Sequence, residues 1–297
     1  MQLSICEDSI KVGAHGNLHG RLWYRASDRD SDSNQPDAVL ITVHGLGDHS
    51  ARFAEMAHQV ISSSNAKIAV VGFDLPSHGQ SPGKPGSLAK FDRLLADIAA
   101  VRQSVVERFG DVPQALLGHS MGGNLAVNYV LRQSSVDSSM PPLLGLVLAA
   151  PMLLPPNPMP RPIIFAAWLT GHLFPFVKFG KAIDVHALTS DPQEIEKIRQ
   201  DDAMHSRITL YLATQLVSQG RWALDHAREV QIPTLVLYGG EDSLIDRNAC
   251  KNLAIRIGKP ATLVSWPETK HSLFHDLRRD DIVARLVQWL DLQLVER

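Results

Sequence analysis

Residues 118–122 read Gly-His-Ser-Met-Gly, with one glycine two positions before the serine and another two positions after it. An apolar run precedes this motif and a helical pattern (121–131) follows it, so the sequence predicts a strand that turns at once into a helix. A serine at the tip of such a sharp turn has a strained backbone and tolerates only neighbours without side chains, which explains the two glycines. The turn would present the Ser120 hydroxyl as a nucleophile beside the first amides of the helix, where an anion can be held.

A serine hydroxyl is a poor nucleophile at neutral pH and needs a base, which a carboxylate must orient. Loops after two later strand candidates supply both groups. Asp242 follows the apolar run 234–238, and His271 follows the run 262–266. The sequence therefore predicts a catalytic triad of Ser120, Asp242 and His271, in the chain order expected for such a site on a wound sheet.

Neighbouring residues compete for two of these roles. Asp246 lies one helical turn after Asp242, where a carboxylate stabilises a helix N-terminus, so we interpret it as a helix cap. His275, one turn after His271, is interpreted as structural or substrate-facing. His119, beside the nucleophile, is interpreted as a packed neighbour that points away from it.

Ester or amide hydrolysis also needs donors for a tetrahedral oxyanion, each worth about 3 kcal/mol of transition-state stabilisation. The amide of Met121, directly after the nucleophile, is one candidate. The amide of Leu46 is the other, in a loop (44–50, His-Gly-Leu-Gly-Asp-His-Ser) whose glycines let the backbone approach the reacting carbon. The alternative interpretation of this loop is a tight turn only. Residues 74–79 are predicted to fix a loop rather than to catalyse.

The elements that must position these residues alternate between short apolar runs and longer amphipathic segments. Continuously apolar runs are typical of strands buried on both faces of a parallel sheet, and the alternation predicts a wound α/β sheet. The first 25 residues alternate in polarity and predict a hairpin at the sheet edge. The other predicted strands are 38–43, 68–73, 114–117, 143–149, 234–238 and 262–266, and the predicted helices are 52–62, 88–109, 121–131, 247–257 and 281–294.

One long interval, between Ala149 and Thr234, contains no predicted strand. It opens with a proline-rich stretch, and proline stops helix and strand alike. We interpret the interval as a helical cap over the carboxyl ends of the strands, where ligands bind in open α/β sheets. The chain then divides into a first part of the core (1–150), the cap (151–230) and a second part of the core (231–297). The predicted cap helices are 163–169, 182–188, 191–199 and 207–227.

Composition excludes several classes of protein. A net charge of −2 over 297 residues lacks the basic character of a nucleic-acid-binding protein. Cys6 and Cys250 have no metal-ligand spacing, and the predicted chemistry needs neither a metal nor a cofactor. The N-terminus lacks a signal-peptide pattern, which favours the cytoplasm. The most apolar window (163–179) is interrupted by polar residues and proline and falls short of a membrane span.

Four motifs occur in a fixed order along the chain, at residues 44–53, 74–81, 118–123 and 240–246. Together they resemble the monoacylglycerol lipase and lysophospholipase branch of the α/β-hydrolases. The resemblance implies a mostly parallel eight-stranded sheet flanked by helices, with a helical cap inserted after the sixth strand. It also implies catalysis by Ser120, Asp242 and His271, with the oxyanion bound by the amides of Leu46 and Met121.

The same resemblance implies a serine ester hydrolase that cleaves single-chain acyl lipids, such as monoacylglycerols or lysophospholipids, through an acyl-Ser120 intermediate. In that family the cap is an amphipathic lid, so a cytoplasmic protein with transient contact to a membrane or micelle is expected. The alternatives are a general carboxylesterase or thioesterase and a peptidase-like hydrolase of small substrates. A non-catalytic binding protein is disfavoured, because the chain offers candidates for every member of the triad.

The sequence leaves more than one role open for two groups of residues in the predicted cap. The apolar runs 163–169 and 173–176 would line an acyl tunnel, form a membrane-facing lid or pack on the core. The polar residues that follow would meet a glycerol head group or act as solvated helix caps. These polar residues are Asp201, Asp202, His205 and Arg207.

Overall fold

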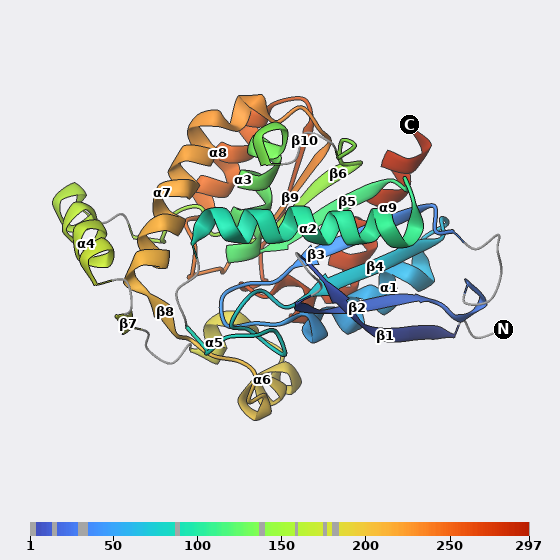
Figure 1. Cartoon of the computed structure of the whole chain (residues 1–297), viewed down its shortest axis with the longest axis horizontal. Coiled ribbons are helices and arrows are strands. Elements are labelled where there is room, and N and C mark those ends of the chain that lie inside the picture. The colour runs from blue at the N-terminus through green and yellow to red at the C-terminus, as the bar shows by residue number, and fades with distance from the viewer. Residues whose placement is uncertain are drawn as a thin grey trace.

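A single twisted sheet organises the chain, and its order is β1-β2-β4-β3-β5-β6-β9-β10 (Figure 1). The computed structural model describes residues 4–13, 17–28, 35–86, 90–136, 140–157, 160–174, 177–179 and 184–296. The strands of the sheet are β1 (Ile5–Val12), β2 (Leu18–Arg25), β3 (Ala38–Val43), β4 (Ile68–Phe73), β5 (Gln114–His119), β6 (Gly145–Ala149), β9 (Thr234–Gly239) and β10 (Ala261–Trp266).

The sheet is mostly parallel. β1 and β2 form the predicted antiparallel hairpin at one edge, and β2 pairs antiparallel with β4. Every other pair, from β4 through β3, β5, β6 and β9 to β10, is parallel. The predicted α/β-hydrolase fold is therefore confirmed in its sheet, and the carboxyl ends of the parallel strands share one edge.

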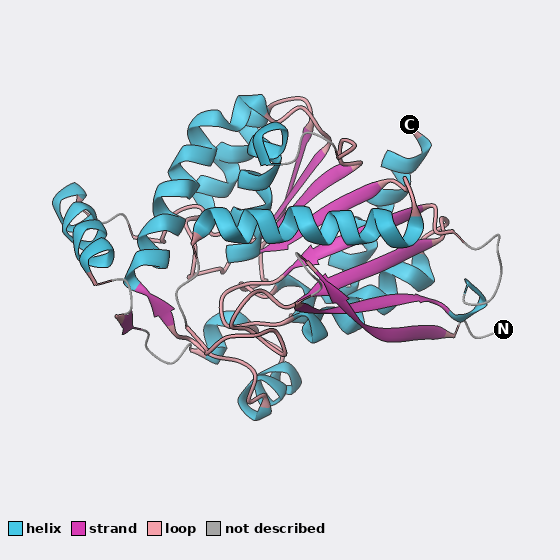
Figure 2. Cartoon of the chain, viewed as in Figure 1, coloured by secondary structure: helices cyan, strands magenta, loops and turns pink. Residues whose placement is uncertain are grey.

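Helices cover both faces of the sheet (Figure 2). Figure 1 shows α2 in front of the sheet and α1 and α9 behind it, and α1 packs against α9. Every residue of β3, β4, β5, β6 and β9 is buried, as the continuous apolar runs predict for a sheet covered on both faces. The covering helices are α1 (Ala54–Ser63), α2 (Phe91–Phe109), α3 (Met121–Val136), α8 (Arg247–Ile257) and α9 (Arg279–Val295).

The chain between β6 and β9 is largely helical, as predicted. The expectation that it contains no strand is wrong at one place, where two-residue strands β7 and β8 pair antiparallel, so α7 begins at Leu210 rather than at residue 207. Residues 182–183 of the helix predicted at 182–188 lie outside the described residues. The elements are α4 (Arg161–Leu173), β7 (Lys178–Phe179), α5 (Val185–Leu188), α6 (Pro192–Gln200), β8 (Ile208–Thr209) and α7 (Leu210–His226).

Only part of the segment between β6 and β9, which we call the insertion, packs against the core of the fold. α7 packs against α3 and also contacts α4, whereas α4 stands away from the sheet at the left edge of Figure 1. The division of the chain at residues 150 and 230 stays a prediction. None of the helices in the described part of the chain has both the length and the apolarity needed to cross a membrane.

Candidate active site

Ser120 sits at the junction of β5 and α3 with a φ of 53°, in the left-handed region that side chains rarely adopt. The glycines on either side are required by close backbone contacts. A Cβ built on Gly118 would lie 2.3 Å from the carbonyl oxygen of Gly122, and one built on Gly122 would lie 2.1 Å from that of Val43. The sequence prediction of a strained strand-to-helix turn at Ser120 is confirmed.

Ser120, His271 and Asp242 form one hydrogen-bonded chain, which loops after three different strands bring together. The Ser120 hydroxyl lies 2.9 Å from Nε2 of His271, and Nδ1 of His271 lies 2.7 Å from Oδ2 of Asp242. Because a carboxylate can only accept, Nδ1 donates to Asp242, which leaves Nε2 free to accept the serine proton. Asp242 and His271 are buried, so water does not compete for these bonds.

The competing aspartate has a different partner. Oδ1 of Asp246 accepts a hydrogen bond of 2.9 Å from the amide of Asn248 and caps the N-terminus of α8. The interpretation of Asp246 as a helix cap is therefore confirmed. Oδ1 of Asp242 accepts from the amide of Leu244 at 2.8 Å, which fixes the carboxylate that faces His271.

Met121 directly follows Ser120, and Leu46 lines the same cavity as Ser120. Met121 begins α3, so its amide is among those that have no acceptor within the helix. A Cβ on Gly45 would lie 3.2 Å from Cβ of Ser120, which shows how closely the loop before Leu46 approaches the serine. The use of these two amides by an oxyanion stays a prediction.

Asp74 joins the end of the loop 44–50 to the segment after β4. Its two carboxylate oxygens accept hydrogen bonds from the amides of Ser50 (2.7 Å) and Gln80 (2.8 Å). The segment 74–79 is therefore a loop-fixing element, as predicted.

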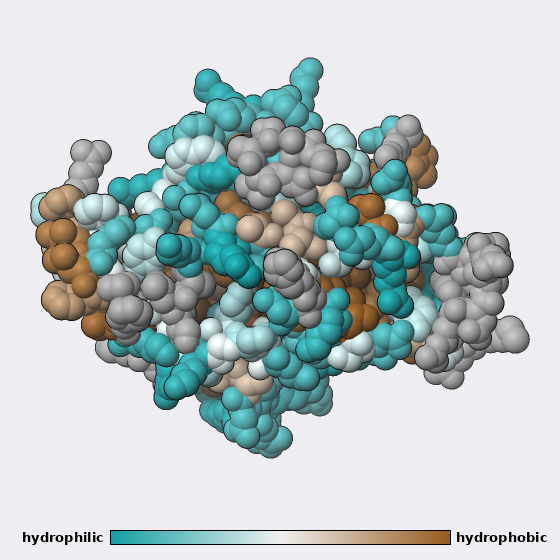
Figure 3. All heavy atoms as spheres, in the orientation of Figure 1, coloured by the Kyte–Doolittle hydropathy of each residue, from teal (hydrophilic) through white to brown (hydrophobic). Residues whose placement is uncertain are grey.

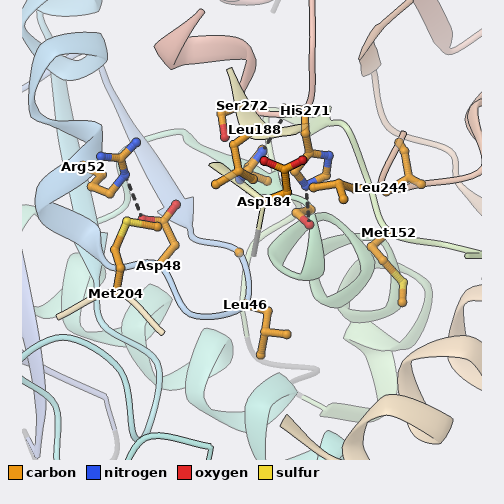
Figure 4. A pocket seen from close by; sticks show the side chains of 14 residues that line it. Leu46, Asp48, Arg52, Met152, Asp184, Leu188, Met204, Leu244, His271 and Ser272 are labelled. Atoms are coloured by element: carbon orange, nitrogen blue, oxygen red, sulfur yellow. Dashed lines mark hydrogen bonds and ion pairs between the residues drawn. The ribbon is translucent and has the colours of Figure 1, made fainter. Parts of the chain in front are cut away.

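A cavity of about 300 Å³ opens beside Ser120. Figure 4 shows Met152 and Leu244 on one side of it and the pair Asp48 and Arg52 on the other. The cavity beside Ser120 thus has apolar side chains on one side and the Asp48 and Arg52 pair on the other, and the acidic residue Asp184 lies near Leu244 and His271. The remaining apolar side chains of the lining are Leu46, Leu188, Met204 and Ile245.

The polar end of the cavity is an ion-paired network that the motif analysis did not single out. Nε of Arg52 lies 3.3 Å from Oδ1 of Asp48, and its Nη2 lies 3.7 Å from Oε2 of Glu194. Burial raises the pKa of Asp48, but the Arg52 guanidinium and the neighbouring histidines together outweigh this effect and lower that pKa to about 2. The spacing of Asp48 and Arg52 by four residues is the sequence signal that would have indicated this pair.

Two further histidines surround the triad as neutral structural groups. Nε2 of His119 donates to the carbonyl oxygen of His271 at 3.2 Å, and burial lowers the pKa of His119 to about 3. His119 is a packed neighbour, as interpreted, although its ring also lines the cavity. Nε2 of His275 donates to the carbonyl oxygen of Arg52 at 2.7 Å, and burial together with Arg52 lowers the pKa of His275 to about 4. Of its two interpretations, the structural one is confirmed.

The apolar run at the start of the insertion neither lines the cavity nor packs on the core. Its described large side chains on α4 and just after it are between 40% and 64% exposed, so the acyl-tunnel and core-packing interpretations are wrong for them. The side chain of Ile164 and residues 175–176 lie outside the described residues. The exposed side chains are Ile163, Phe165, Trp168, Leu169, Leu173 and Phe174.

No metal site emerges from the part of the chain that the structure describes. Among the described residues there is no group of three or more His, Cys, Asp or Glu side chains that could hold a metal ion.

Comparison with known proteins places this geometry among hydrolases. Residues 34–278 match the family model described as serine aminopeptidase, S33. The monoacylglycerol lipase of Mycolicibacterium smegmatis is 24% identical over 272 residues, which cover 91% of this chain and 92% of that relative. An uncharacterized abhydrolase domain-containing protein of Dictyostelium discoideum is 24% identical over 258 residues, and the chain spans 26% of its length.

A solved structure shares the fold over the whole chain. The crystal structure of the Paleococcus ferrophilus monoacylglycerol lipase has a TM-score of 0.75 and 22% identity, and the match covers 99% of this chain and 100% of that one. At this identity the likeness supports the α/β-hydrolase fold alone.

We expect Asp242→Asn to lower kcat on a p-nitrophenyl ester by about 100-fold or more, because an amide no longer holds the His271 tautomer that accepts the serine proton. Asp246→Asn is the matched control, and it should retain activity within about twofold since asparagine also caps helices. Steady-state kinetics of both variants, with Ser120→Ala as the blank, measure this. An equal loss in the two variants would contradict the assignment of Asp242.

We expect acid to destabilise the fold below pH 6.5. Burial lowers the pKa of His78 and His119 to about 3 and that of His275 to about 4, so only the unfolded chain takes up their protons above those values. The free energy of unfolding therefore decreases as the pH is lowered, by about 1–2 kcal/mol per histidine between pH 7.5 and pH 5. Urea unfolding at these two pH values tests the expectation away from the titration of Asp48, and equal stabilities would refute it.

Proposed function

Because this chain belongs to the serine aminopeptidase S33 family of α/β-hydrolases, we propose that it is a serine ester hydrolase that cleaves single-chain acyl lipids, such as monoacylglycerols or lysophospholipids. One observation carries the proposal. The hydrogen-bonded chain of Ser120, His271 and Asp242 opens onto a cavity with an apolar wall. The name of the Mycolicibacterium smegmatis relative, a monoacylglycerol lipase, supports the same substrate class.

In the acylation step the Ser120 oxygen attacks the ester carbonyl carbon, and its proton passes to Nε2 of His271. The carbonyl oxygen becomes an oxyanion, which accepts hydrogen bonds from the amides of Leu46 and Met121. Asp242 stabilises the imidazolium that forms. Collapse of the intermediate breaks the ester bond, and the alcohol leaves with the proton from His271.

The deacylation step repeats this sequence with water. His271 removes a proton from a water molecule, whose oxygen attacks the acyl-Ser120 carbonyl carbon. The second tetrahedral intermediate uses the same two amides. Its collapse releases the fatty acid and returns the proton to the Ser120 oxygen, so no external cofactor is consumed.

The two ends of the cavity suit the two parts of such a substrate. The walls around Met152 and Leu244 are apolar and suit an acyl chain, whereas the Asp48 and Arg52 pair suits a hydroxylated alcohol. A volume of about 300 Å³ lies at the lower end of the roughly 300–1,000 Å³ typical of ligand pockets, which favours one acyl chain over two.

The family description names an alternative, an aminopeptidase. A peptide with a free amino end needs an unpaired carboxylate near the nucleophile. Among the described residues that line the cavity, the acidic ones are Asp48, which pairs with Arg52, and Asp184, which caps α5 by accepting from the amide of His186. Asp48 is thus neutralised by a cation, whereas Asp184 uses one oxygen for the cap and has no ion-pair partner among the described residues, so a peptide substrate is included in the test below.

The exposed apolar side chains of Ile163, Phe165, Trp168, Leu169, Leu173 and Phe174 form what we call the α4 surface. Figure 3 shows hydrophobic residues gathered at the left edge of the molecule, where α4 lies. A contiguous exposed apolar surface on a helix is typical of proteins that rest in a lipid interface. We therefore propose that α4 and the rest of the insertion form a cap whose α4 surface contacts membranes or micelles, so the protein is peripheral there.

The first test is fatty-acid release from monoacylglycerols of rising chain length, beside lysophosphatidylcholine, a short p-nitrophenyl ester and proline p-nitroanilide. We expect Ser120-dependent release that is fastest on medium or long monoacylglycerols, because a longer chain buries more apolar surface in the cavity. Ser120→Ala is the blank.

Two results would redirect the proposal. Activity on the short ester alone would refute the lipid substrate and leave a general esterase. Release of p-nitroaniline faster than fatty acid would favour the aminopeptidase.

The α4 surface is tested by Phe165→Glu, which places a charge where an apolar side chain would enter the lipid. We expect vesicle binding to fall about tenfold, consistent with the roughly 1.5–3 kcal/mol gained by burying such a side chain. Hydrolysis of a soluble p-nitrophenyl ester should stay within twofold. Ile255→Glu on α8 is the matched control, because Ile255 is 72% exposed and lies on another element.

Co-sedimentation with phosphatidylcholine vesicles measures the binding of both variants. An equal loss for Ile255→Glu would show that any added negative charge weakens binding, which contradicts a specific role for α4.

A further inference from the structure

The oxyanion loop, residues 44–50, touches a distant part of the chain. Residues 201–205, between α6 and β8 of the insertion, lie against it. We call these five residues the clamp segment. They lie outside the triad, and Met204 among them lines the same cavity as Leu46.

The oxyanion loop is weakly closed by its own hydrogen bond. The amide of Asp48 lies 3.4 Å from the carbonyl oxygen of Gly45, at the long end of the range for such a bond. Gly47 within this turn has a φ of 69°, so the turn depends on a conformation that only glycine adopts freely. The amide of Leu46, at the centre of the turn, therefore needs support from outside the loop to hold one direction.

The backbone of His205 supplies a first support. Its amide donates a hydrogen bond of 3.0 Å to the carbonyl oxygen of Gly47. The contact is so close that a Cβ on Gly47 would lie 1.5 Å from the carbonyl oxygen of His205. The absence of a side chain at position 47 thus serves both the turn and its contact with the insertion.

The side chain of Asp201 supplies a second support. Nε2 of His49 donates to Oδ2 of Asp201 at 2.8 Å, while Oδ1 of Asp201 accepts from the amide of Ala203 at 3.0 Å. The two side chains are only 12% and 24% exposed, so water screens the bond little. Asp201 therefore joins the end of the oxyanion loop to the clamp segment itself.

Ring contacts supply a third support at the start of the loop. The ring of His205 packs on that of His78 at 4.7 Å, and His78 packs on His44 at 5.1 Å. Nδ1 of His44 donates to the carbonyl oxygen of Gly45 at 2.8 Å. The clamp segment thus reaches the oxyanion loop at its beginning, its middle and its end.

We propose that the clamp segment holds the Leu46 amide in the direction that an oxyanion requires, and that Asp201 is a positioning residue that acts through His49. The inference rests on the proposed serine hydrolysis. An oxyanion hole works because its donors are fixed before the reaction, so a loosened donor costs turnover more than substrate binding. The insertion then takes part in the chemistry of the site besides lining it.

The decisive variant is Asp201→Ala, assayed on a soluble p-nitrophenyl ester. We expect kcat to fall at least tenfold while KM changes less than threefold. Asp202→Ala is the matched control, because Asp202 is exposed and has no hydrogen bond or ion pair among the described residues. It removes the same charge from the same segment and should stay within twofold in both constants.

Two further measurements separate positioning from general damage. The Ser120 oxygen adds to the carbonyl carbon of an alkyl trifluoromethyl ketone, and the serine proton moves to His271. The ketone oxygen then becomes an oxyanion that occupies the proposed oxyanion hole. The affinity of the ketone should fall in Asp201→Ala by the same factor as kcat/KM. The double variant His49→Ala with Asp201→Ala should lose no more than either single variant, since the two residues act through one bond.

His49→Ala removes the same hydrogen bond from the side of the oxyanion loop, so it provides the second variant if Asp201→Ala does not fold, and a tenfold loss of kcat is expected there too. Unchanged ketone affinity, or a loss confined to KM, would overturn the inference while Ser120-dependent hydrolysis by the parent protein upholds the proposed function. A parent protein without Ser120-dependent hydrolysis would overturn both.

Discussion

The close packing of the Ser120 turn against the end of β3 determines the geometry of the whole site. Gly122 lies so near the carbonyl oxygens of Val43 and His44 that no side chain fits between them. Because β3 and β5 are neighbours in the parallel sheet, the loop after β3 must start beside the nucleophile. The positive φ of Ser120 and the close approach of Gly45 accompany this contact, and a side chain at position 118 or 122 would clash with the backbone there.

The remaining catalytic groups reach Ser120 by the same logic of strand order. β9 and β10 end at the same edge of the sheet as β5, so Asp242 and His271 arrive there on short loops. Two hydrogen bonds from the insertion hold the loop after β10, which carries His271. The amide of Ser272, next to His271, donates to the carbonyl oxygen of Leu188 at 2.8 Å, and the hydroxyl of Thr189 donates to that of His275 at 2.7 Å. The base and the oxyanion loop thus share one support.

The sequence predicted what depends on local pattern. Buried parallel strands produce continuous apolar runs, and few residues follow their carboxyl ends, so the Gly-x-Ser-x-Gly motif predicted Ser120 and position after a strand predicted Asp242 and His271. The bond between His49 and Asp201 joins residues 152 positions apart, and no periodic pattern encodes it. The exposure of the α4 surface was equally hidden, since an apolar helix reads the same whether it faces a core or solvent.

The insertion combines two parts with different mechanical demands. Residues 188–205 form hydrogen bonds with the oxyanion loop and with the loop after β10. They contain few exposed apolar groups, as is expected of a segment that holds a fixed geometry. α4 packs mainly on α7, and its ring contact between His172 and Tyr211 lies away from the triad. We therefore expect substitutions on α4 to leave Leu46 and His271 in place. Substitutions in the clamp segment should displace the oxyanion loop. The two proposals, membrane contact by α4 and positioning of the Leu46 amide by the clamp segment, thus concern separate stretches of one insertion.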